Sequence, residues 1–177
     1  MTNFINFITV ARIFLAPIIL IFLIFGNYLV CVLLFFLAGL TDYFDGYLAR
    51  KYNAESQLGE ILDPIADKIL IVFILIGLSV DLDSFLIAFL GSLIIAREIG
   101  VSALRDYSSR NNKSHKTKVT YLAKIKTSVQ LFSIGLYLFA LAFSFNLLII
   151  ISDIFLIIAT LITLYTGYEY TLNVFKK

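Results

Sequence analysis

The sequence predicts an all-α integral membrane protein with six transmembrane helices, and three observations support this fold class. Of the 177 residues, 60% are hydrophobic, and a mean hydropathy of +0.96 exceeds what the core of a water-soluble domain needs. The hydrophobic runs are long and do not alternate with a period of two, which favours helices over the strands of a membrane barrel. Six such runs separated by polar segments fit one membrane domain, 1–177.

Each element follows from its own stretch of sequence. Residues 1–12 mix Asn, Thr and Arg with Phe and Ile at helical spacing, which predicts a short N-terminal interfacial helix. Short turns are expected at 26–29, 80–84 and 144–146, and longer polar connections at 50–60 and 105–118. The six predicted spans between them are 8–25, 30–48, 61–80, 85–104, 121–143 and 147–168.

The distribution of basic residues predicts the orientation of these spans. The three short turns contain no Lys or Arg, and only Arg97 lies well inside a span. Because Lys and Arg accumulate on the cytoplasmic side of a membrane, we expect both termini and the longer connections there. The basic residues on this side are Arg12, Arg50, Lys51, Lys68, Arg105, Arg110, Lys113, Lys116, Lys118, Lys124, Lys126, Lys176 and Lys177. His115 lies among them, in what we expect to be a solvated loop.

Four aspartates at the cytoplasmic ends of the second and third spans are candidate metal ligands. Asp42 and Asp45 are three residues apart, and Asp63 and Asp67 are four apart, so each pair shares one helix face. Carboxylates this close repel one another unless a cation lies between them. Hard ions such as Mg²⁺ prefer carboxylate oxygens, and one His and one Cys leave little to bind zinc. Ordinary polar helix ends would explain one or two such residues, but not four.

The aspartates belong to a longer pattern, which resembles the signature of the CDP-alcohol phosphotransferases without a gap or substitution. The pattern reads Asp42-x2-Asp45-Gly46-x2-Ala49-Arg50-x8-Gly59-x3-Asp63-x3-Asp67. The resemblance implies six transmembrane helices and two metal ions, Mg²⁺ or Mn²⁺, bound by the four aspartates. It implies that Asp67 is also the general base, and that the CDP group binds at Gly46, Ala49, Arg50 and Gly59. The reaction implied transfers a phosphatidyl or smaller phosphoalcohol group from CDP to an alcohol and releases CMP.

Three further segments resemble the bacterial phosphatidylglycerophosphate synthases of this family. They are Asn3-x2-Asn6-x2-Thr9-x2-Arg12 with Pro17, Ala96-Arg97-Glu98 with Ser102-Ala103-Leu104-Arg105, and 123–130. Ala103 and Ala123 stand where these enzymes often have Gly. The resemblance implies a homodimer in the bacterial inner membrane that uses CDP-diacylglycerol and glycerol 3-phosphate, with its active site at the cytoplasmic face. It implies that some of Arg97, Arg105, Lys124 and Lys126 hold the phosphate of glycerol 3-phosphate.

The residues alone leave alternatives open. Arg97 is as well explained by an internal ion pair with Glu98 or a signature aspartate, and Lys124 and Lys126 by contact with lipid headgroups. The same chemistry could use inositol phosphate, serine or phosphatidylglycerol as the acceptor. A divalent-ion transporter is a third hypothesis, but its carboxylates would line a pathway across the spans rather than cluster at one face. We expect a lipid bilayer and no nucleic acid as a partner, and the sequence assigns no function to Asp153.

Overall fold

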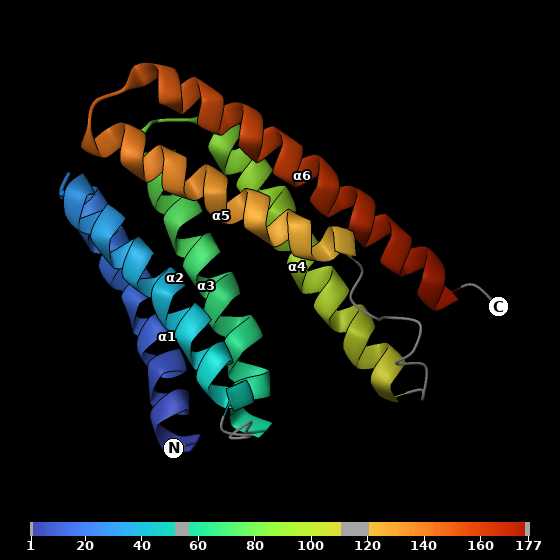
Figure 1. Cartoon of the computed structure of the whole chain (residues 1–177). Helices are drawn as coiled ribbons and strands as arrows, with labels where there is room; N and C mark the ends of the chain where they lie inside the picture. The colour runs from blue at the N-terminus through green and yellow to red at the C-terminus, as the bar shows by residue number, and fades with distance from the viewer. Residues whose placement is uncertain (1, 52–56, 111–120, 176–177) are drawn as a thin grey trace.

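The computed structural model describes residues 2–51, 57–110 and 121–175, which form six helices and no strand (Figure 1). These confirm the predicted fold class and the order of its elements. The helices are α1 (Thr2–Ile24), α2 (Tyr28–Lys51), α3 (Gln57–Asp81), α4 (Phe85–Arg110), α5 (Tyr121–Ala142) and α6 (Asn146–Phe175).

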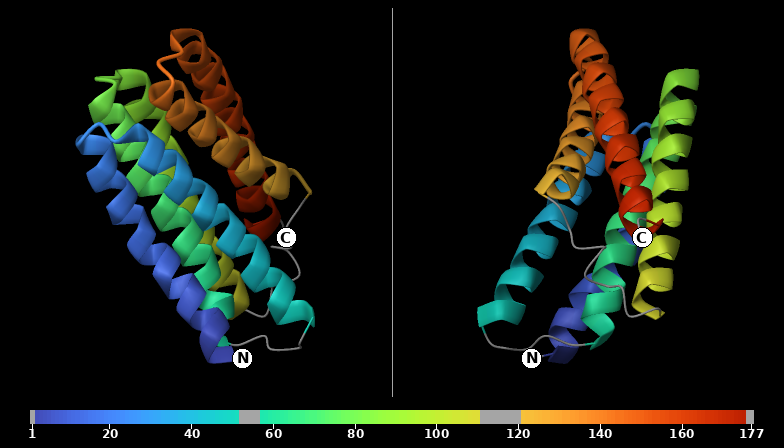
Figure 2. Two further views of the ribbon diagram at one scale, coloured as in Figure 1. Left: turned by 60° about the vertical axis from the view of Figure 1, so that its left-hand side comes forward. Right: turned by 90° about the vertical axis from the view of Figure 1, so that its right-hand side faces the viewer.

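Three tight turns divide the bundle into three helical hairpins, α1–α2, α3–α4 and α5–α6, and all three turns lie at the same end (Figures 1 and 2). Gly26, Asp83 and Ser144 each have a positive φ there. The residue after each of them donates its backbone N–H to a carbonyl five residues earlier, as from Asn27 to Phe22 at 2.9 Å. This is the Schellman arrangement, in which a left-handed residue satisfies the last carbonyls of a helix and reverses the chain.

Four of the helices contain segments long and apolar enough to cross a membrane: 7–24, 85–110, 125–143 and 146–175. In α2 the apolar stretch is shorter and covers 28–44. In α3 the charged residues Asp63, Asp67 and Lys68 leave only the run after Lys68 uninterrupted. The polar residues that shorten these two apolar stretches are those of the predicted site.

The core contains buried residues from all six helices, and close helix contact sets its geometry. Ile19 and Leu23 of α1 are fully buried with Ile74 and Leu78 of α3. Gly77 makes this contact possible, because a Cβ there would lie 2.8 Å from the Leu20 side chain. The α1–α3 contact therefore places the polar N-terminal half of α1 beside the aspartates of α3.

The helices extend further into polar sequence than predicted. The expected interfacial helix over 1–12 is not separate, since α1 runs from Thr2 to Ile24 without interruption. The helix can continue through its polar residues, because Thr9 and Arg12 are buried and contact aspartates of other helices. Similarly, α4 continues to Arg110 and α6 to Phe175, beyond the apolar segments from which their ends are predicted.

Candidate active site

Three of the four signature aspartates are held by two side chains of α1. Arg12 Nη1 lies 2.5 Å from Asp42 Oδ1 on α2 and 3.1 Å from Asp67 Oδ1 on α3. One turn earlier, Thr9 Oγ1 donates a hydrogen bond to Asp63 Oδ1 at 2.9 Å. Thr9 and Arg12 are almost fully buried. A buried guanidinium is costly without an anionic partner, so Arg12 stabilises the protein only while Asp42 and Asp67 stay beside it. These contacts hold α1, α2 and α3 together at the site.

The carboxylates of this site remain open on their outer side. The Asp42 and Asp67 side chains are 49% and 40% exposed, whereas Arg12 is 1% exposed. Both aspartates contact the same Arg12 nitrogen, so their Oδ1 atoms lie close together. Partly exposed carboxylate oxygens grouped in this way are the donors that a hard divalent cation takes.

The structure describes the side chains of three of the four predicted metal ligands, Asp42, Asp63 and Asp67. Asp45 lies on α2 one turn after Asp42, but its side chain is outside the described part. Among the described side chains, no group of three His, Cys, Asp or Glu is close enough to hold an ion. Asp42 and Asp67 nevertheless offer a divalent cation two partly exposed carboxylates on one guanidinium.

The residues predicted to bind CDP lie on both sides of the connection between α2 and α3. Gly46 is half-buried near the end of α2, and Gly59 is buried in the first turn of α3. Ala49 and Arg50 are in the last turn of α2, with side chains that the structure does not describe. His115 and the basic residues of 111–118 also lie outside the described residues.

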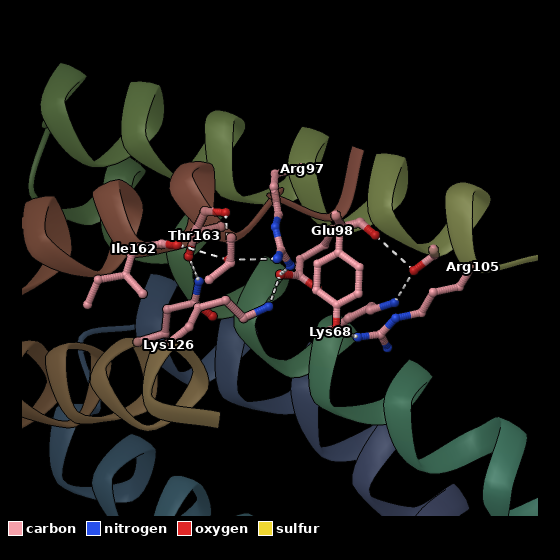
Figure 3. Close-up of polar contacts among 11 residues, drawn as sticks. Lys68, Arg97, Glu98, Arg105, Lys126, Ile162 and Thr163 are labelled. Atoms are coloured by element: carbon pink, nitrogen blue, oxygen red, sulfur yellow. Dashed lines mark hydrogen bonds and ion pairs between the residues drawn. The ribbon is translucent and has the colours of Figure 1, made fainter. Parts of the chain in front are cut away.

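A cavity of about 660 Å³ opens between α3, α4 and α5, and Asp67 lies on its wall. Arg97, Arg105 and Lys126 line it, so the structure brings together three of the four residues predicted to bind phosphate (Figure 3). The side chain of Lys124 lies outside the described part. We call this space the basic cavity.

Arg97 is fixed on one wall of the basic cavity by α4 and α6. Its guanidinium lies 2.9 Å from Glu98 Oε1 and donates to Thr166 Oγ1 at 2.8 Å. Its aliphatic chain packs on Gly167, where an added Cβ would lie 2.9 Å from Arg97 Cγ. Of the two ion pairs that the sequence allowed for Arg97, the pair with Glu98 is the one present among the described residues.

The basic cavity is lined and supported by residues that the sequence did not single out as site residues. Lys68 follows Asp67 on α3 and donates to Ser102 Oγ on α4 at 2.5 Å. Arg105 donates to Tyr170 Oη on α6 at 3.0 Å, with its guanidinium 5.1 Å from the ring centre. Lys68 could have been found from its position next to the signature. Tyr170 and Thr166 carry no local signal, because their roles depend on the packing of α6 against α4.

A second, smaller cavity of about 280 Å³ reaches the same aspartates from the side of α2 and α5. Arg12, Asp42 and Asp67 line it, and its remaining lining is apolar: Phe35, Phe36, Ala38, Gly39, Leu40, Leu70 and Leu131. We call it the apolar cavity. Asp67 therefore lies on the wall of both cavities, between a basic space and an apolar one.

Asp153, to which the sequence assigns no function, lies outside this site. It accepts a hydrogen bond from Tyr137 Oη, which is fully buried on α5. The pair connects α5 and α6, so Asp153 contributes to helix packing.

Known proteins resemble the chain over most of its length. The model of the CDP-alcohol phosphatidyltransferase family matches residues 2–165. The chain is 39% identical to a Rickettsia typhi protein over 96% of each chain. It is 40% identical to one from Rickettsia felis over 95% of this chain and 93% of the relative. Identity to a Haemophilus influenzae protein is 34%, over 93% and 89%. All three relatives are named CDP-diacylglycerol–glycerol-3-phosphate 3-phosphatidyltransferase.

Proposed function

The chain belongs to the CDP-alcohol phosphatidyltransferase family, and on this premise we propose that it transfers the phosphatidyl group of CDP-diacylglycerol to glycerol 3-phosphate. The products are phosphatidylglycerophosphate and CMP. The names of relatives that cover nearly the whole chain support this choice of substrates. The observation that carries the proposal is the position of Asp67 between the basic and the apolar cavity.

The two cavities suit two substrates of different chemistry. An apolar cavity that ends at Asp42 and Asp67 suits a donor whose acyl chains stay in the bilayer and whose phosphates meet the aspartates. The basic cavity suits a small water-soluble phosphate ester, because Arg and Lys are the usual phosphate-binding side chains. Neither cavity by itself would serve both substrates.

The family uses divalent metal ions, and we propose two Mg²⁺ ions, replaceable by Mn²⁺, held by Asp42, Asp45, Asp63 and Asp67. When bound, such ions neutralise a pyrophosphate and stabilise the attacking and leaving oxygens of an in-line displacement. Gly46, Ala49, Arg50 and Gly59 would contact the CDP group. Thr9 and Arg12 position the carboxylates from the buried side.

Asp67 is the general base in this proposal, which its position on the wall of the basic cavity supports. An alcohol is a weak nucleophile near neutral pH, and a positioned carboxylate that accepts its proton accelerates attack. The hydroxyl of glycerol 3-phosphate would give its proton to Asp67 as its oxygen bonds to the phosphatidyl phosphorus. The bond from that phosphorus to the bridging oxygen then breaks, and its electron pair leaves with CMP.

The setting of this chemistry is also part of the proposal. The C-terminal end of α2 and the N-terminal end of α3 carry the aspartates and lie at the end of the bundle opposite the three tight turns (Figure 1). Because those turns contain no Lys or Arg, we place the active site at the cytoplasmic face of a bacterial inner membrane. Family resemblance favours a homodimer. Light scattering of the purified protein in detergent would measure its oligomeric state.

The decisive experiment measures CMP release by the purified protein in detergent with CDP-diacylglycerol and Mg²⁺. We expect release that requires glycerol 3-phosphate, stops with a chelator and resumes with added Mg²⁺. Release only with serine, inositol phosphate or phosphatidylglycerol would keep the aspartate chemistry and overturn the acceptor. Folded protein that releases no CMP with any of these acceptors would contradict the enzymatic proposal as a whole.

A further inference from the structure

The cations of the basic cavity fall into two groups according to their partners. Arg97 and Lys126 both contact the same oxygen, Glu98 Oε1 (Figure 3). Their side chains are only 6% and 8% exposed, and Glu98 is 19% exposed. Each of these enclosed cations thus already has an anionic partner, although the cluster keeps one net positive charge.

Lys68 and Arg105 form the other group. Lys68 donates to the hydroxyl of Ser102, and Arg105 to the hydroxyl of Tyr170. These partners are neutral, and no ion pair with a carboxylate involves Lys68 or Arg105 among the described residues. Glu98 is the nearby anion on which the Lys68 charge acts, but the hydrogen-bond partners given for Lys68 and Arg105 are neutral, which favours an anionic ligand in the cavity that both cations line.

The cost of binding differs between the two groups. A phosphate that binds Lys126 competes with Glu98 for this ammonium, and a displaced Glu98 would keep only its ion pair with Arg97 among the described residues. Leaving a buried charge without its partner is strongly unfavourable. A phosphate that approaches Lys68 only replaces or adds to a hydroxyl contact, which costs little.

We propose that Lys68, together with Arg105, is the primary contact of the acceptor phosphate, while Arg97, Glu98 and Lys126 form a closed cluster that shapes the cavity wall. The inference rests on the proposed function and refines its phosphate site. Lys68 is adjacent to Asp67 on α3 and both line the basic cavity. One helix turn would thus hold the phosphate of the acceptor and receive the proton of its hydroxyl. Ser102 and Tyr170 keep the two cations in place.

The test compares Lys68→Met with Lys126→Met in the CMP-release assay, with Lys68→Arg as the charge-preserving control. For Lys68→Met we expect the KM for glycerol 3-phosphate to rise about tenfold or more, with the KM for CDP-diacylglycerol within about twofold of wild type. Lys68→Arg should recover most of the loss. Lys126→Met should lower Tm and change the acceptor KM less than Lys68→Met does. If Lys68→Met does not fold, Lys68→Gln replaces it, because its amide can still bond Ser102.

Two results would overturn the inference: an acceptor KM within about twofold of wild type for the folded Lys68 variant, or a larger rise for Lys126→Met. A separate readout uses inorganic phosphate as the probe. Phosphate should raise the Tm of wild type and of Lys126→Met, but not that of Lys68→Met, and an equal rise in all three would contradict the proposal. If wild type does not use glycerol 3-phosphate, the proposed function fails, and the phosphate comparison still decides the role of Lys68.

Discussion

At the scale of single residues, the site depends on one buried cation and the carboxylates around it. Arg12 contacts Asp42 and Asp67 from the protein interior, while both carboxylates keep an exposed side. The guanidinium orients them and offsets their mutual repulsion. Asp42 and Asp67 are partly exposed, so substitutions there report on function more than on folding, whereas Arg12 is buried and its replacement also affects stability.

Replacing Asp67 with Asn should abolish CMP release while the protein remains folded. The amide cannot accept the proton of the acceptor and is a poor metal ligand, and loss of general-base catalysis alone lowers rates by about 10²–10⁴-fold. CMP release and thermal unfolding in detergent measure the two effects. Asp153→Asn is the matched control, because Asp153 pairs with Tyr137 away from the site and its replacement should preserve turnover. Wild-type turnover by Asp67→Asn would exclude Asp67 as the general base.

Replacing Arg12 with Met should destabilise the protein in the absence of metal, by about 1–3 kcal/mol. The loss is smaller than for a fully buried ion pair, because Asp42 and Asp67 are partly exposed. Mg²⁺ should raise the Tm of this variant more than that of wild type, since the ion then supplies the missing positive charge. Melting curves with and without Mg²⁺ measure this difference, and Arg12→Lys is the charge-preserving control. An equal Tm loss with and without Mg²⁺ would show that Arg12 acts only by packing.

At the scale of elements, α6 supports two arginines in the wall of the basic cavity although it contributes none of the predicted site residues. Thr166, Gly167 and Tyr170 all contact arginines of α4. Tyr170 lies near both guanidiniums, at 6.0 Å from Arg97 and 5.1 Å from Arg105. Movement of α6 would therefore change the position of both arginines together.

Gly167→Ala tests this role of α6. Its Cβ would lie 2.9 Å from Arg97 Cγ and 3.1 Å from Arg97 Nε, so Arg97 must shift. We expect a loss of about 1–2 kcal/mol of stability and an increased KM for glycerol 3-phosphate, since overpacking outweighs the better helix propensity of Ala. Gly100→Ala on α4 is the control, because a Cβ added there would meet no described atom of another helix within 4 Å. Similar KM values for the two variants would indicate that Arg97 adapts freely.

At the scale of the whole molecule, the arrangement of hairpins predicts which parts of the chain are accessible from each side of the membrane. Cys31 is the only cysteine and it is buried, so introduced cysteines can be labelled selectively. Ser144→Cys, in the turn between α5 and α6, should react with a membrane-impermeant maleimide in cells whose outer membrane is permeabilised and whose inner membrane is intact. Ser109→Cys, near the end of α4, should react only after the inner membrane is opened. The reverse pattern would invert the proposed orientation.

The sequence predicted the parts of this structure that depend on local patterns. Apolar run length predicted six helices, and the spacing of Asp42, Asp63 and Asp67 placed their carboxylates at one end of α2 and α3. The ends of α4 and α6 were placed too early, because a polar helix that leaves the apolar layer has no hydropathy signal. The spacing from Arg12 to Asp67 is 55 residues, and that from Arg105 to Tyr170 is 65. Such pairings depend on helix packing, which no local pattern encodes.

The three Schellman turns have a consequence for how the protein reaches the membrane. Each connection at that end of the bundle is only a few residues long and contains no Lys or Arg. Each hairpin can therefore enter the bilayer as a pair of helices, and almost no chain has to be carried across. In the proposed orientation, the basic segments of the sequence stay on the side where synthesis delivers them. The opposite surface consequently offers very little polypeptide to a protease, an antibody or a soluble partner.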